Sequence, residues 1–134
     1  MTNMLITPKL AIIGNTRLHK ISSNGTRIMF KYGTKIIKVD SENTPYGNLY
    51  NQCRNEVKLY KKLDKCDKKY FCRPIKHGRK WVIQDIIKFK KGRRPKWAFD
   101  LVESLFFKYK LHDFHEENWG IKENGQPIIF DYGV

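Results

Sequence analysis

The sequence has few cysteines, few acidic residues and no long apolar run. Its three cysteines, Cys53, Cys66 and Cys72, are odd in number and show no Cys-x-x-Cys spacing, which argues against a disulfide framework or a zinc site. No stretch reaches the length of a membrane span. The early apolar runs, interrupted by Pro8, do not form a signal peptide. We therefore expect a cytoplasmic protein with free thiols.

The shortage of acidic residues makes the chain strongly cationic. The 134 residues include 27 Lys and Arg but 13 Asp and Glu, which gives a formal charge of +14. Such a charge attracts nucleotides, nucleic acids or acidic protein surfaces, but it does not define a fold. The length is that of one domain, and a hydrophobic content of 40% argues against disorder.

The residue pattern predicts an α+β domain. Gly33-Thr34 separates two β-rich segments and is a hairpin signal. Apolar residues recur at helical spacing in two places, once after the Asn43–Asn48 turn and once after Pro95. Trp81, Trp97 and Trp119 are interpreted as packing residues. The expected elements are strands 17–22, 27–32 and 35–40, a helix over 48–63, a strand pair over 70–77 and 80–87, a helix starting near 95, and a hairpin with strands 119–122 and 127–130.

The residues with the strongest chemical signal lie near the C-terminal end of the sequence. Asp113 and Asn118 form an Asp-x-x-x-x-Asn pattern after the second predicted helix, and the final strand ends in Asp131-Tyr132-Gly133. Phosphoryl transfer uses a carboxylate near the attacking hydroxyl and oxygen ligands for magnesium. The predicted hairpin returns Asp131 toward Asn118, so the three side chains are expected to face one point.

These two motifs together resemble those of the protein-kinase superfamily. The form Asp113-Phe114-His115-x-x-Asn118 is closest to that of aminoglycoside-phosphotransferase-like and phage-encoded small kinases. The resemblance implies that ATP and Mg²⁺ are cofactors. It implies that Asp113 accepts the proton of the substrate hydroxyl, while Asn118 and Asp131 ligate magnesium.

The same resemblance makes predictions for the first half of the chain. Lys38 lies where the family has its strand lysine, and Glu56 lies on the inward face of the next predicted helix. A buried lysine requires such an acid. The short loop Ser23-Asn24-Gly25 is expected to bind phosphate through its backbone. Asp85 and Ile87 are expected at a hinge whose backbone binds the adenine.

The resemblance implies a minimal two-lobe fold. Residues 1–87 would form the N-terminal lobe and hinge, and 88–134 a reduced C-terminal lobe of one helix and a hairpin. The family's three-glycine phosphate loop is reduced here to one glycine, and little sequence follows Asp131-Tyr132-Gly133. The family's peptide-docking region lies beyond that motif, so the resemblance implies no substrate.

Two alternatives follow from the charge. The chain could be a non-catalytic kinase-like protein that blocks an acidic target, as small phage effectors do, and its Lys- and Asn-rich composition is compatible with a viral origin. Simple nucleic-acid binding is the other alternative. Both depend on one basic segment between the predicted hinge and the second helix, composed of Lys88, Lys90, Lys91, Arg93, Arg94 and Lys96.

Overall fold

The computed structural model describes residues 3–23, 27–41, 51–111, 114 and 116–132, and it is an α+β structure. Within these residues, two α-helices accompany three sheets whose strand pairs are all antiparallel. The predicted fold class is confirmed at this level. No helix in the described residues is long and apolar enough to cross a membrane.

The first seventeen residues contribute a small sheet that the residue pattern does not predict. Strands β1 (Met4–Ile6), β2 (Ala11–Ile13) and β3 (Thr16–Arg17) pair in that order. Ala11 and Ile13 are buried against the larger sheet's apolar residues, including Phe30 and Ile37. The early apolar runs are therefore short strands that cover one part of that sheet.

The central element is a five-stranded sheet in the order β4-β5-β6-β8-β7. Its first three strands form the expected meander, and β4 contains a bulge between Lys20 and Ser22. Gly33 has a φ of 58°, as in the type II′ turns that favour glycine at their first central position. The strand bounds are β4 His19–Ser23, β5 Arg27–Tyr32, β6 Lys35–Asp40, β7 Lys76–His77 and β8 Trp81–Asp85.

The expected strand over 70–77 is wrong for most of its length. Strand β7 comprises two residues, and Lys68–Tyr70 is a 3-10 helix. Phe71 instead forms a parallel bridge with Ile129, and the Cys72 N–H donates to the Ile129 carbonyl at 2.8 Å. Pro74 has no N–H to give to a ladder. Residues 71 and 72 therefore pair with β10 of the C-terminal hairpin, and the segment joins the five-stranded sheet only at Ile75, whose N–H donates to the Ile83 carbonyl.

The two helices pack against different parts of the molecule. Helix α1 (Gln52–Lys62) lies on the sheet, where Cys53 and Val57 contact Val82. Helix α2 (Lys96–Lys108) begins directly after Pro95, as expected. It buries Val102 and Phe106 against the β9–β10 hairpin in a separate core. The prediction of packing is wrong for Trp97, which is 57% exposed on α2.

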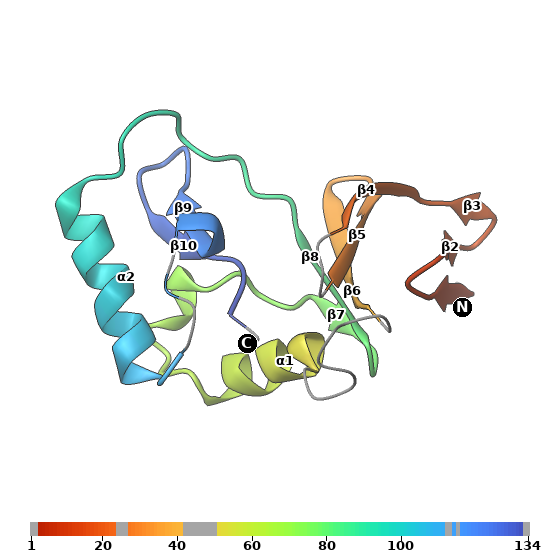
Figure 1. Cartoon of the computed structure of the whole chain (residues 1–134), viewed down its shortest axis with the longest axis horizontal. Helices are drawn as coiled ribbons and strands as arrows, with labels where there is room; N and C mark the ends of the chain where they lie inside the picture. The colour runs from red at the N-terminus through yellow and green to blue at the C-terminus, as the bar shows by residue number, and fades with distance from the viewer. Residues whose placement is uncertain (1–2, 24–26, 42–50, 112–113, 115, 133–134) are drawn as a thin grey trace.

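The C-terminal hairpin is close to its predicted position, with strands β9 (Trp119–Ile121) and β10 (Pro127–Ile129). Figure 1 shows α2 with this hairpin at one end of the molecule, the small sheet β1–β3 at the other end, and the five-stranded sheet between them. The chain after β10 returns toward α1 and the sheet (Figure 1). This return brings the last described residues close to side chains of β5, β6 and α1.

Candidate functional site

Lys38 and Glu56 meet in the interior between the sheet and α1. Lys38 lies on β6 and is 2% exposed, and its Nζ is 3.3 Å from Oε1 of Glu56, which is fully buried. The Lys38 ammonium also donates to the carbonyl of Phe130. An ammonium has three donors, so these two bonds leave one donor for another acceptor. The residue pairing expected from the sequence is present.

Arg27 is a member of this cluster that the sequence reasoning missed. Its Nη2 lies 2.7 Å from Glu56 Oε1 and also forms an ion pair with Oδ1 of Asp131. The register could have identified it, because a two-residue hairpin at Gly33-Thr34 pairs Met29 with Lys38 and Arg27 with Asp40. Alternate residues share a face, so Arg27 had to lie on the face of Lys38.

Asp131 and Asn118 are brought together by the hairpin. The N–H groups of Phe130 and Asp131 both donate to the Asn118 carbonyl, at 3.0 and 3.3 Å. Asn118 is buried, while the Asp131 side chain is 22% exposed. Among the ion-paired residues of the interior, Asp131 is thus the one that solvent reaches.

The charges in this cluster stabilise one another. Burial disfavours an ionised Glu56, but the charges of Arg27 and Lys38 outweigh it and hold the pKa of Glu56 below its ordinary value. Burial likewise disfavours a charged Arg27, and Glu56 and Asp131 outweigh it, so the pKa of Arg27 is raised. Two cations therefore face two carboxylates. One carboxylate oxygen, Glu56 Oε2, is buried and has no hydrogen-bond partner among the described residues.

The donors near Asp131 are compatible with magnesium in type. Magnesium binds through one or two carboxylates and takes other ligands from water and phosphate, and Asp131 and Asn118 offer a carboxylate and an amide. Within the described residues, no group of three or more His, Cys, Asp and Glu side chains could hold a metal ion. Arg27 already occupies Oδ1 of Asp131. A cation at this position would therefore compete with the guanidinium.

Several predicted residues cannot be placed in this geometry. Asp113, Asn24 and Gly25 lie outside the described residues. Ser23 is the last residue of β4. Lys38 is 2% exposed and does not line three of the cavities formed by described residues, those of about 540, 490 and 230 Å³. Because so little of Lys38 is exposed, a phosphate group would reach its amine only if neighbouring groups moved.

The expected hinge residues, Asp85 and Ile87, lie at the end of β8 and just after it. Asp85 is the last residue of β8 and forms an ion pair with Lys35. Asp85 and Ile87 line the cavity of about 540 Å³, to which Arg27, Lys38, Glu56, Asn118 and Asp131 do not contribute. The role of Asp85 and Ile87 as adenine contacts therefore stays a prediction.

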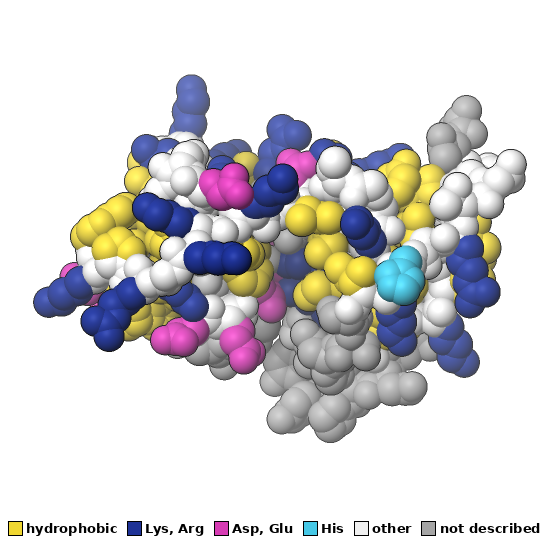
Figure 2. Space-filling view, turned by 90° about the horizontal axis from the view of Figure 1, so that it is seen from above, with side chains coloured by type: hydrophobic (Ala, Val, Ile, Leu, Met, Phe, Trp, Pro, Cys, Tyr) yellow, Lys and Arg dark blue, Asp and Glu magenta, His cyan; other side chains and the backbone are white. Residues whose placement is uncertain are grey.

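The basic segment before α2 is exposed except at one residue. Arg94 is half-buried, its guanidinium lies 4.5 Å from the centroid of the Trp119 ring, and its Nη1 donates to the Trp119 carbonyl at 3.1 Å. Arg94 thus has a packing role that its place in a charge run did not reveal. Figure 2 shows Lys and Arg side chains scattered over the described part of the face in view. The exposed cations of the segment are Lys88, Lys90, Lys91, Arg93 and Lys96.

The chain was also compared with known proteins. Neither a protein-family model nor a curated protein sequence matches it.

Proposed function

We propose that this chain is an ATP- and Mg²⁺-dependent phosphotransferase with a reduced, two-lobe, kinase-like fold. The observation that supports it is the convergence of Lys38, Glu56 and Asp131, from β6, α1 and the chain after β10, on one interior point. Each charge here is far from its partner in sequence, and a buried charge is retained only with good partners.

In this proposal, Glu56 holds the Lys38 ammonium in place, and the remaining donor of Lys38 binds a phosphate oxygen of the nucleotide. Asn118 and Asp131 hold the magnesium ion, which offsets phosphate charge when bound. Asp113, outside the described residues, accepts the proton of the substrate hydroxyl. Arg27 positions Asp131 and Glu56 at the same time.

Binding must open the cluster, because Arg27 and Lys38 are nearly inaccessible and Asp131 is the exposed member. A phosphate oxygen can replace the Asp131 carboxylate as a partner of the guanidinium, since arginine binds both groups in the same geometry. Asp131 would then be released toward the metal ion. Nucleotide and magnesium are therefore expected to stabilise the protein more together than separately.

Thermal unfolding tests this proposal, because a ligand of the native state raises apparent stability. ATP with Mg²⁺ should raise the melting temperature of the wild type, and Lys38→Met and Asp131→Asn should remove that increase relative to their own ligand-free forms. Lys31→Met is the matched control, since Lys31 lies on β5 but is exposed. In parallel, Asp113→Ala should abolish ATP consumption. The proposal fails if the wild type shows no nucleotide-dependent shift.

The closed cluster also favours a second candidate, a non-catalytic binding protein that acts through its exposed basic segment. Arg27 neutralises Asp131 without any metal ion, so the cluster can also serve as a purely structural ion-pair network. Reversal of charge at Lys91 and Arg93, both exposed, should then abolish binding to a polyanion such as heparin or a single-stranded oligonucleotide. Asp131→Asn should leave that binding unchanged, and the affinity should fall steeply with salt.

A further inference from the structure

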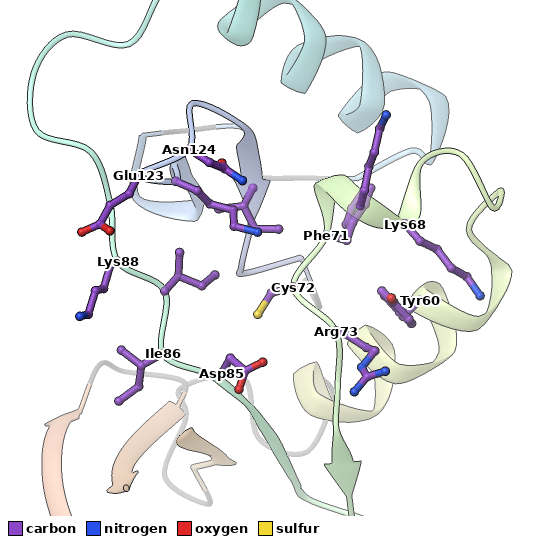
Figure 3. A pocket seen from close by; sticks show the side chains of 14 residues that line it. Tyr60, Lys68, Phe71, Cys72, Arg73, Asp85, Ile86, Lys88, Glu123 and Asn124 are labelled. Carbon is purple, nitrogen blue, oxygen red and sulfur yellow. The ribbon is translucent and has the colours of Figure 1, made fainter. Parts of the chain in front are cut away.

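The cavity of about 540 Å³ lies between three segments that are distant in the sequence. These are the Phe71–Arg73 segment, the chain that leaves β8 from Asp85 to Lys88, and the turn between β9 and β10. Figure 3 shows it from close by, with Cys72 projecting into the space between the first two. Its volume is in the range of sites that hold small molecules.

The cavity is separate from the Lys38 cluster. The Phe71–Cys72 segment stands between them: the Cys72 N–H donates to Ile129, and the Tyr132 hydroxyl donates to the Cys72 carbonyl at 2.6 Å. Ile128 lines the cavity, whereas the next residue, Ile129, is part of the core around α2. A molecule in the cavity would therefore contact none of the residues proposed for phosphoryl transfer, apart from the expected hinge.

The floor of the cavity is apolar and firmly held. Phe71, Cys72 and Ile128 line it and are each less than 10% exposed. The Phe71 ring packs edge-on against Tyr109 and Tyr132, with ring centroids 5.9 and 5.1 Å away. Such a floor does not have to be ordered when a ligand arrives, which reduces the entropy cost of binding.

The rim is cationic. Two acidic residues, Asp85 and Glu123, also line the cavity, and Asp85 is neutralised by Lys35. Lys68 lies 5.3 Å from the Tyr60 ring centroid, and Figure 3 shows it with Arg73 on the α1 side, opposite Lys88 and Glu123. Within the described residues, the side chains of Arg73, Lys88 and Lys122 form no ion pair. The five cations of the lining, an excess of three over its acids, are Lys68, Lys69, Arg73, Lys88 and Lys122.

We propose that this cavity is a second binding site, for a small organic anion with an apolar and preferably aromatic body. The body would lie on the floor formed by Phe71 and Ile128 and would remove the exposed surface of Ile86, which is 39% exposed, from water. The anionic group, a phosphate, sulfonate or carboxylate, would pair with Arg73 or Lys122 at the rim. This site shares Asp85 and Ile87 with the residues expected to bind adenine, but neither Lys38 nor Asp131 belongs to it, so it can be tested apart from the proposed phosphotransferase activity.

Fluorescence titration with 1-anilinonaphthalene-8-sulfonate tests the site, with its neutral parent N-phenyl-1-naphthylamine as the matched ligand. The wild type should bind the sulfonate more tightly than the neutral compound. Arg73→Met with Lys122→Met should weaken sulfonate binding about tenfold, as expected for loss of a charged contact, and leave the neutral compound nearly unaffected. Lys58→Met with Arg79→Met removes the same charge from another cavity and should change binding less than about twofold.

Cys72 supplies a readout inside the site itself. Burial raises the pKa of the Cys72 thiol to about 11, so its reaction with a thiol reagent is slow and depends on access. In a Cys66→Ser background, which removes the exposed cysteine, the sulfonate should slow labelling of Cys72 severalfold in the wild type but not in the Arg73 and Lys122 double variant.

Three outcomes would overturn the proposal: equal weakening in the two double variants, equal affinity for the charged and neutral compounds, or unchanged labelling of Cys72. Cooperative urea unfolding of each variant shows that a lost signal does not come from a lost fold. Asp131→Asn separates this proposal from the phosphotransferase one, because it should abolish the nucleotide-dependent shift and leave sulfonate binding intact.

Discussion

Arg27 and Asp131, 104 residues apart in the sequence, form an ion pair that joins β5 to the chain after β10. The same guanidinium contacts Glu56 on α1. One buried side chain thus connects the sheet, a helix and the C-terminal hairpin region. Its loss should affect all three.

Arg27→Met should lower the free energy of unfolding by about 3–5 kcal/mol, the cost of breaking a buried ion pair by removing one partner. Arg27→Lys should lower it by less, because the ammonium keeps the positive charge. Some loss should remain, because an ammonium cannot contact Glu56 and Asp131 in the geometry of the guanidinium. Urea denaturation monitored by circular dichroism measures both. A loss in Arg27→Met no greater than in Lys31→Met, an exposed position on the same strand, would contradict the central role of the pair.

Glu56→Gln should be more destabilising than Lys38→Met. Glu56 faces two buried cations, so its neutralisation leaves both Arg27 and Lys38 without their shared partner. In Lys38→Met, the Arg27–Glu56 contact at 2.7 Å remains. Leaving buried cations without their partner costs more free energy than removing one cation of the cluster. Equilibrium unfolding of the two single variants and the double variant gives each loss of unfolding free energy and the coupling energy between the two residues. A larger loss in Lys38→Met than in Glu56→Gln would refute this account.

Stability should fall in acid partly because of Glu56. Although burial acts in the opposite direction, Arg27 and Lys38 hold the folded-state pKa of Glu56 below its ordinary value of 4.5. The unfolded chain therefore binds more protons, so the contribution is complete above about pH 4.5 and is lost as the pH falls through the depressed value. Below pH 4.5, Glu56→Gln should show a shallower decline than the wild type. Glu103→Gln, at an exposed position of α2, should decline like the wild type.

Gly120→Ala should disturb the contact between the basic segment and the hairpin. A Cβ at this position would lie 2.6 Å from two carbons of the Phe89 ring, which also packs against Phe130. Overpacking costs about 1–3 kcal/mol. Phe89→Ala in the same chain should relieve the clash, so the double variant should be more stable than the sum of the single effects predicts. Strict additivity in a double-mutant cycle would show that the ring moves aside freely.

Arg93 and Arg94 should differ although they are neighbours in one charge run. Arg94→Ala removes the contact with the Trp119 ring and the bond to its carbonyl, and we expect a loss of about 1–2 kcal/mol. Arg93→Ala, at an exposed position, should leave the unfolding midpoint unchanged. The opposite result in thermal unfolding would mean that the packing of Arg94 is unimportant.

The local pattern predicts those parts of the fold that depend on neighbouring residues. Gly33-Thr34 determines the register that pairs Met29 with Lys38, and helical spacing turns Glu56 inward against it. Both follow from periodicity and turn chemistry alone.

The remaining features depend on long-range contacts that periodicity does not encode. Phe71 pairs with Ile129 rather than with β8, so the expected strand over 70–77 shrinks to two residues. Arg27 acquires its role only when Asp131 returns to the sheet. The sequence does not distinguish Arg94 from the other cations of its segment, because its packing depends on the position of the Trp119 ring. In each case the decisive partner lies more than twenty residues away.

The bulge in β4 has a consequence for how the molecule behaves in concentrated solution. Strand β4 is one of the two outer strands of the five-stranded sheet, and the irregularity lies between Lys20 and Ser22. A flat outer strand is a template for intermolecular β-pairing, and a twist together with a lysine discourages it. His19 and Lys20 are exposed there. The bulge thus opposes aggregation through this edge of the sheet.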